Sequence, residues 1–176
     1  MLEIPKGAVF GSSNPMMLGR AINGLQLFWS KDGESTYSHT GMFIDDKGTT
    51  LESLWTVRSQ DFFSAYEGDN VIIAVPDAER FVVDSAVAQI VLRHKGQIYP
   101  AWRLLFHLFP PLAKVAPLDR LVCSELVAKY EWLVGVRHRQ YKGTNPDTLA
   151  DEWRRWKKFK VIFEGRLVKE DLVPST

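Results

Sequence analysis

Residues 38–55 read SHTGMFIDDKGTTLESLW, and this stretch decides most of the fold. Residues 40–44 and 49–55 are rich in β-branched and aromatic side chains, and the DDKG segment at 45–48 has the composition of a tight turn. The stretch therefore predicts a β-hairpin. It also places His39 at the mouth of the first predicted strand.

The rest of the chain combines apolar runs with helical patterns. Further strands are predicted at 71–75, 160–163 and 166–168, the last two as a pair about the turn residues Glu164 and Gly165. Apolar residues at helical spacing predict helices over 77–95 and about 121–134, and the residues Asn145-Pro146-Asp147 predict the start of a third helix over 145–156. Asp77 and Asp119 are available as N-caps of the first two helices, and Gly96 and Gly135 follow their last turns.

The composition is that of an ordinary globular chain. It has 176 residues, of which 45% are hydrophobic and 24% charged, and we found no internal repeat or low-complexity tract. We therefore expect one α+β domain over residues 1–176. The net charge of +1 provides no global field to attract a polyanion, so no nucleic-acid partner is expected.

The sequence offers no targeting or spanning segment. Residues 1–6 contain no basic stretch that leads into an apolar core, so a secretory signal is not expected. The most apolar segment, 104–118, is interrupted by Pro110, Lys114 and Pro117 and is shorter than the roughly 20 residues that a membrane span requires. We expect a cytoplasmic protein, or one exported without a recognisable signal peptide.

The single cysteine, Cys123, is a candidate nucleophile. It lies in the first turn of the predicted helix 121–134, where the helix dipole and free backbone N–H groups favour the thiolate. The alternative is an inert packing residue, because a lone cysteine is usually buried. One cysteine excludes an intramolecular disulfide, and four scattered histidines show no metal-binding spacing, so no metal or organic cofactor is expected.

His39 is the candidate base for that thiol. Gly41 follows it on the same strand and leaves room for another group to approach closely. The alternative for His39 is a hydrogen-bonded structural group, and His138 is the rival base. His94, at the end of a predicted helix where positive charge is favoured, and His107, in a proline-flanked apolar segment, are set aside.

Glu52 is the candidate carboxylate. It interrupts the apolar second arm of the hairpin, where it could accept a hydrogen bond from the far nitrogen of His39 and fix the imidazole tautomer. The alternative is a solvent-facing position on an edge strand. Asp45 and Asp46 are other carboxylates, but they lie in the turn at the opposite end of the hairpin.

Five blocks of sequence carry a family resemblance. They are SHTGMFI at 38–44, LES at 51–53, GQIY at 96–99, VCSELV at 122–127 and GTNPDTL at 143–149. In this order they resemble the circularly permuted papain-like amidases, the YiiX-like branch of the NlpC superfamily, in which the histidine hairpin precedes the cysteine helix. The resemblance implies an antiparallel sheet or small barrel packed against the helix of the nucleophile, with Cys123, His39 and Glu52 as the catalytic triad.

The resemblance also suggests secondary site residues. Tyr99 would lie near the nucleophile and support an oxyanion donor, although a buried core tyrosine is an equal alternative. Ser38 and Ser124 are further candidates for binding substrate or the oxyanion. In the family a Gly-Asp pair precedes the first strand, whereas residues 6–10 read KGAVF here and lack the acid.

We therefore expect a cysteine-dependent hydrolase or acyltransferase that acts on an amide or ester through a thioester. Relatives implied by the resemblance cut peptidoglycan peptides or move fatty acyl chains, and the sequence does not choose between them. The apolar segment 102–118 either lines an acyl-chain groove or is a buried connection. A catalytically inactive member that binds peptide or lipid is the alternative function.

The segment 137–160 is a second candidate surface. It is rich in Lys and Arg, with Trp153 and Trp156 among them, and could meet an anionic lipid, a cell-wall polymer or a nucleic acid. The alternative is a solvated helix face whose tryptophans belong to the core. An adaptor that uses this segment is the third class of function considered.

Overall fold

The computed structural model describes residues 3–13, 36–54, 56–98, 121–139, 141 and 144–168. Three sequence predictions lie outside these residues: Tyr99, the capping candidate Asp119 and the apolar segment 102–118. None of the helices in the described part of the chain has the length and apolar character needed to cross a membrane.

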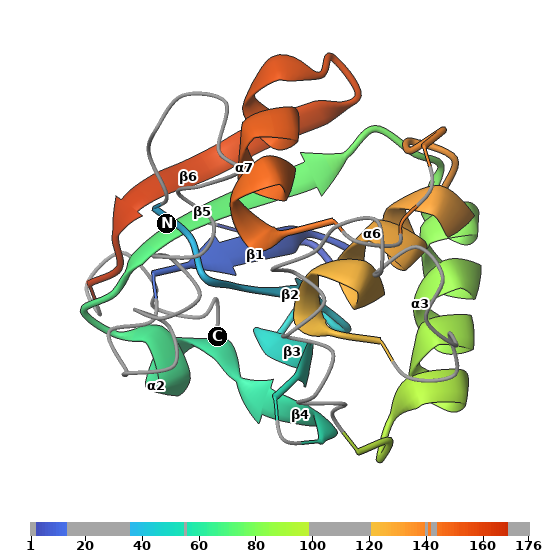
Figure 1. Ribbon diagram of the computed structural model, residues 1–176, viewed down its shortest axis with the longest axis horizontal. Coiled ribbons are helices and arrows are strands. Elements are labelled where there is room, and N and C mark those ends of the chain that lie inside the picture. Colours follow the sequence, from blue (N-terminus) through green and yellow to red (C-terminus); the bar gives the residue numbers. More distant parts are fainter. Residues whose placement is uncertain are drawn as a thin grey trace.

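A six-stranded antiparallel sheet forms the centre of the described structure (Figure 1). Its strands are β1 (Val9–Ser12), β2 (His39–Phe43), β3 (Thr49–Ser53), β4 (Val57–Asp61), β5 (Asn70–Pro76) and β6 (Phe159–Arg166). They are arranged in the order β4-β3-β2-β1-β5-β6. The strand that carries His39 is therefore interior, with β1 on one side and β3 on the other.

The predicted hairpin is confirmed as β2 and β3. Its turn is held by Asp45, whose carboxylate accepts the backbone N–H groups of Lys47 and Thr49, both at 2.9 Å. Gly48 adopts a φ of +91°, a conformation that favours glycine. The second arm ends at Ser53, before the predicted end at residue 55.

One strand prediction is wrong, and the strands β1 and β4 were not predicted. β6 is one continuous strand through Glu164 and Gly165, not two short strands about a turn, because it pairs with β5 along its whole length. The pairing places Gly165 opposite Val71, so the glycine lies within the ladder. β4 was not predicted from the sequence pattern, because its residues, VRSQD, are mostly polar.

In the described part of the chain, four helices pack on the sheet: α2 (Phe62–Tyr66), α3 (Arg80–His94), α6 (Cys123–Leu133) and α7 (Pro146–Arg155) (Figure 1). α3 begins at Arg80, later than predicted, and its N-cap is Glu79 and not Asp77. Asp77 directly follows the end of β5, and its backbone N–H donates to Lys158 O at 2.8 Å. The predicted start of α7 is confirmed, since the Asn145 side chain accepts the Thr148 N–H at 2.7 Å.

The two faces of the sheet have different covers. α3, α6 and α7 bury one face, which includes Met42 and Leu51. α2 packs on the opposite face, where Phe62 contacts Phe10 and Phe43 with ring centroids 4.8 Å from each. Fully buried side chains of this size each contribute about 1.5–3 kcal/mol, so both layers stabilise the sheet that carries the candidate site.

Candidate active site

The hairpin brings His39 and Glu52 together. Gly41 on β2 lies opposite Glu52 on β3, and side chains alternate along a strand, so His39, Gly41 and Glu52 share one face of the sheet. His39 Nε2 lies 2.9 Å from Glu52 Oε2. Both side chains are buried, and Glu52 is on an interior strand, which rules out the solvent-facing edge position.

Gly41 is needed for this pairing. A Cβ atom at Gly41 would lie 2.7 Å from Glu52 Cγ and 2.6 Å from Phe10 Cε1, both too close for carbon atoms. The Glu52 side chain therefore crosses over the bare glycine on its way to His39. The close approach predicted at Gly41 is confirmed.

Cys123 is the first residue of α6, and its side chain meets His39. The thiol is hydrogen bonded to the His39 imidazole, and its sulfur accepts hydrogen bonds from the backbone N–H groups of Thr40 and Ser124. Because Nε2 of His39 is bound to Glu52, the nitrogen that faces the sulfur is Nδ1. The structure thus brings together the three residues predicted as a triad.

The ionisation of the three groups is coupled. Burial alone would raise the pKa of Cys123, but the hydrogen bond and charge of His39 and the two backbone N–H groups lower it. Burial alone would lower the pKa of His39, but its bonds to Cys123 and Glu52 and their negative charges raise it to about 10. The pKa of Glu52 is lowered by His39 against the effect of burial. The arrangement favours a thiolate beside an imidazolium.

Glu52 has three further donors that sequence reasoning missed. Thr50 Oγ1 donates to Glu52 Oε1 at 2.5 Å, and Gln60 Nε2 donates to Oε2 at 2.9 Å. The Tyr66 hydroxyl also donates to Oε2. Thr50 could have been found from the two-residue period of the strand, whereas Gln60 and Tyr66 come from β4 and α2, which were not predicted.

Two serine hydroxyls hold the start of α6 in place. Ser53 Oγ, at the end of β3, donates to Leu121 O at 2.9 Å. Ser124 Oγ donates to Thr144 O at 2.5 Å, which joins α6 to the segment before α7. The predicted site residue Ser124 therefore lies beside the nucleophile, with its hydroxyl donated to the main chain. Ser38, next to His39, is buried, and its backbone N–H donates to Ser12 O at 3.0 Å.

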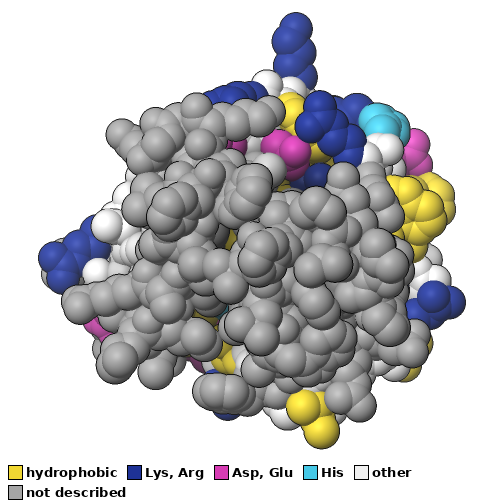
Figure 2. All heavy atoms as spheres, in the orientation of Figure 1, with side chains coloured by type: hydrophobic (Ala, Val, Ile, Leu, Met, Phe, Trp, Pro, Cys, Tyr) yellow, Lys and Arg dark blue, Asp and Glu magenta, His cyan; other side chains and the backbone are white. Residues whose placement is uncertain are grey.

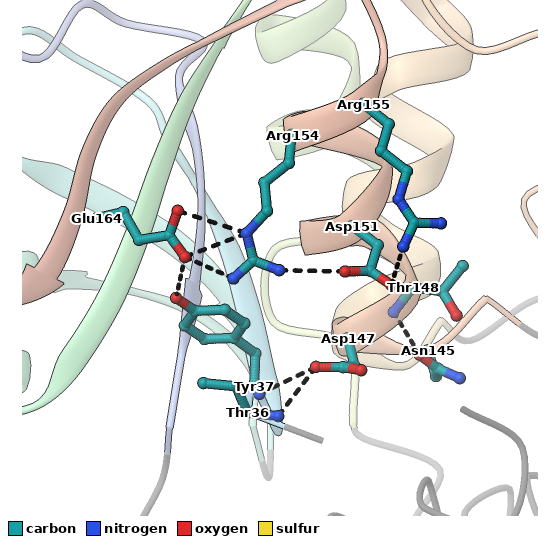
Figure 3. Close-up of polar contacts among 9 residues, drawn as sticks. All are labelled: Thr36, Tyr37, Asn145, Asp147, Thr148, Asp151, Arg154, Arg155 and Glu164. Carbon is teal, nitrogen blue, oxygen red and sulfur yellow. Dashed lines mark hydrogen bonds and ion pairs between the residues drawn. The ribbon is translucent and has the colours of Figure 1, made fainter. Parts of the chain in front are cut away.

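A polar cluster holds the residues that lead into β2 (Figure 3). The Asp147 carboxylate, in the first turn of α7, accepts the backbone N–H groups of Thr36 at 3.0 Å and Tyr37 at 3.4 Å. The Tyr37 hydroxyl donates to Glu164 on β6 at 3.1 Å, and Arg154 of α7 lies over the Tyr37 ring and also binds Glu164. The segment before His39 is therefore fixed by elements more than one hundred residues later in the chain.

The other described histidines lie outside the triad. His138 is exposed, contacts Lys158 at 2.6 Å, and follows the far end of α6. Since α6 has 11 residues and Cys123 is the first of them, that end is about 15 Å from Cys123. His94 bonds to Gln97 and Lys129, both at 3.0 Å, and its pKa is lowered by burial. His94 is therefore not placed to act as the base, in agreement with the sequence analysis, although burial opposes the positive charge expected at this helix end.

In the described part of the basic segment 137–160, the arginines are paired with acids. Figure 2 shows Lys and Arg side chains along the upper edge of this face, with Asp or Glu side chains among them. Arg137 is buried and binds Glu131 at 2.7 Å, and it also pairs with Glu152. Trp153 belongs to the core, as the alternative interpretation expected. Binding of this segment to an anionic surface stays a prediction.

The described α+β fold, with its six-stranded antiparallel sheet, is shared with a solved bacterial structure. That structure is the metalloprotein YiiX from Escherichia coli O157:H7, which is 15% identical to this chain, with a TM-score of 0.63 over 93% of this chain and 98% of that one. A likeness at this identity shows the fold alone. No protein-family model matches the sequence, and no curated protein does.

The described residues do not fit a metal ion. Across the ranges that the structure describes, no three side chains of His, Cys, Asp or Glu come together as a ligand set. His39 Nε2 and Glu52 Oε2 are bound to each other, and Glu52 accepts hydrogen bonds from three more donors that a cation would have to displace. The term metalloprotein therefore applies to the bacterial YiiX structure.

Proposed function

We propose that this protein is a cysteine-dependent hydrolase or acyltransferase that acts on an amide or ester bond through a thioester on Cys123. One observation carries the proposal. The Cys123 thiol is hydrogen bonded to His39, whose other ring nitrogen lies 2.9 Å from the buried carboxylate of Glu52. This order of nucleophile, base and orienting carboxylate is the arrangement that activates a thiol for acyl transfer.

The chemistry follows from these positions. The Cys123 thiolate attacks the carbonyl carbon, and backbone N–H groups at the start of α6 stabilise the oxyanion that forms. As the carbon–nitrogen or carbon–oxygen bond breaks, the His39 imidazolium gives its proton to the leaving group. Neutral His39 then takes a proton from water, or from another acceptor, which attacks the thioester and releases Cys123.

The chain order supports a permuted papain-like interpretation. The hairpin with His39 and Glu52 precedes the helix with Cys123, as it does in the family that the sequence resembles. The fold likeness to YiiX points in the same direction, since YiiX gives its name to that branch. We propose that the fold is a circularly permuted papain-like fold of the NlpC type.

Trapping the acyl-enzyme tests the proposal. The protein is incubated with activated p-nitrophenyl esters and with acyl amides, quenched in acid, and examined by mass spectrometry. We expect an acyl adduct on Cys123 that hydroxylamine removes, as it does a thioester. Cys123→Ser should keep the fold and lose turnover, because the hydroxyl is a much weaker nucleophile at this site. His138→Ala serves as a control and should keep both the adduct and turnover.

Two results would contradict the proposal. Turnover retained by Cys123→Ser would remove the cysteine from the mechanism. A thiol that forms no adduct with any ester or amide, and that reacts with alkylating agents only after unfolding, would indicate a structural cysteine. The protein would then be better explained as a binding module built on the same fold.

A further inference from the structure

The Glu52 carboxylate is held more firmly than its bond to His39 alone requires. Oxygen Oε2, which faces His39, also accepts hydrogen bonds from the Gln60 amide at 2.9 Å and from the Tyr66 hydroxyl. The other oxygen, Oε1, accepts from Thr50 at 2.5 Å. Four donors on one buried carboxylate leave it little freedom to rotate.

Tyr66 contacts two members of the triad. It is buried at the end of α2, a short helix whose Asp61 side chain accepts the Ser64 N–H at 2.8 Å. Its hydroxyl reaches Glu52, and its ring stacks on His39, with centroids 6.3 Å apart and planes inclined by 19°. A phenylalanine ring would fill the same space, so core packing accounts for the ring and leaves the hydroxyl to be explained.

Gln60 has its orientation set by a neighbour. Arg58 Nη2 lies 3.4 Å from Gln60 Oε1, so the amide nitrogen of Gln60 is the end that points to Glu52. Arg58 is exposed and lies opposite Glu52 in the β3–β4 register. Among the described residues, the titratable groups that face His39 are Glu52 from β3, Cys123 from α6 and Tyr66 from α2, with Arg58 of β4 behind Glu52.

We propose that Tyr66, assisted by Gln60, is a positioning residue that holds Glu52 Oε2 against His39 and so keeps the imidazolium–thiolate pair formed in the resting protein. This inference rests on the proposed function. Burial and the charge of Glu52 both raise the pKa of Tyr66, so the phenol stays protonated as a donor. If the carboxylate could turn away, the imidazolium would lose its fixed counter-charge and the thiol would ionise less readily.

The test measures the pKa of Cys123 in Tyr66→Phe by thiolate absorbance in the far ultraviolet. The chain contains one cysteine, so the signal below the range where tyrosines ionise belongs to Cys123. We expect the pKa of the thiol to rise by about one unit, which lowers the thiolate fraction roughly tenfold at pH values below both pKa values. Glu52→Gln should move it in the same direction and further.

Tyr130→Phe is the matched control. Tyr130 is also buried and donates its hydroxyl to Gly7 O at 2.8 Å, on the opposite face of the sheet, so its loss should leave the pKa of Cys123 unchanged. Circular dichroism checks that each variant folds. Should Tyr66→Phe fail to fold, Gln60→Met removes the other donor to Oε2, and a smaller rise in the same direction is expected.

The outcomes separate the two proposals. A wild-type thiol with an ordinary pKa would remove the imidazolium–thiolate pair and the proposed function with it. A low wild-type pKa that is unchanged in Tyr66→Phe would overturn the positioning role alone. A fall in the pKa of Cys123 would also overturn it, because the hydroxyl would then act by withdrawing charge from Glu52 and not by fixing its place.

Discussion

At the scale of single residues, the site depends on both ring nitrogens of His39 having a partner. Nε2 is bound to Glu52 and Nδ1 faces Cys123, so the tautomer and the ring orientation are set before any substrate arrives. Glu52 is the residue whose role the structure changes most. From the sequence, Glu52 is either a member of the triad or an exposed residue on an edge strand. Its complete burial excludes the exposed position.

Glu52→Gln should lower kcat/KM by roughly 10²-fold, which is less than the loss in Cys123→Ser. The amide keeps the shape of the side chain but not its charge, so it no longer stabilises the imidazolium, while the nucleophile remains. Steady-state kinetics on an activated ester measure the difference. Unchanged kinetics in Glu52→Gln would show that the carboxylate has no part in the reaction.

Gly41→Ala should destabilise the protein by about 1–3 kcal/mol, because the new methyl group overlaps Glu52 and Phe10. Urea denaturation measures the loss. The same variant should slow alkylation of Cys123, since Glu52 must move away from His39 to make room. Ala88→Gly, on the exposed side of α3, serves as the control. It is expected to cost only about 1 kcal/mol and to leave the reactivity of Cys123 unchanged. Gly135→Ala would not serve, because the φ of +78° at Gly135 is strained for alanine.

The pH dependence of kcat/KM is expected to be bell-shaped. The rate should rise with pH as the thiol ionises, at a pH below its ordinary pKa, because His39 and backbone N–H groups stabilise the thiolate. It should fall again as pH rises through about 10, where His39 loses the proton that the leaving group needs. An acidic limb centred on the ordinary thiol pKa would contradict the ion pair.

At the scale of elements, the triad depends on the hairpin, on the start of α6 and on what holds them together. The sequence predicted the hairpin and the cysteine helix because each is a local pattern that its own residues complete. β4 was missed because its sequence is mostly polar, and its residue Gln60 bonds to Glu52 and is not part of an apolar core. Tyr66 lies 14 residues from Glu52, and no local pattern joins the two.

Asp147, in the first turn of α7, holds the segment that leads into β2. Asp147→Ala should destabilise the protein by about 1–3 kcal/mol, because the backbone N–H groups of Thr36 and Tyr37 lose their acceptor. Asp147→Asn should cost less, since one acceptor oxygen remains. Asp151→Ala, on the same helix, removes more exposed ion pairs with Arg154 and Arg155 and is expected to cost under about 1 kcal/mol.

Chemical denaturation of the three variants makes the comparison. Equal losses for Asp147→Ala and Asp151→Ala would mean that the contact with residues 36 and 37 contributes nothing specific. A loss confined to Asp147→Ala, together with slower alkylation of Cys123, would link the first turn of α7 to the position of His39.

At the scale of the whole molecule, the length of the acyl group distinguishes a lipid substrate from a peptide substrate. If the protein binds an acyl chain, kcat/KM should rise with chain length in a series of p-nitrophenyl esters, because each buried methylene is worth about 0.8 kcal/mol. Short peptides should then be poor substrates. A flat or falling dependence on chain length, together with efficient cleavage of a cell-wall peptide, would remove the lipid hypothesis and favour a peptidase.

The most direct test of the central claim is the rate at which iodoacetamide alkylates Cys123 in the folded protein at neutral pH. We predict that the wild-type thiol reacts as a thiolate, that His39→Ala slows the reaction because the thiol loses its counter-charge, and that His138→Ala leaves it unchanged. A thiol that does not react until the protein unfolds, or a rate that falls in His138→Ala and not in His39→Ala, would contradict the proposed triad.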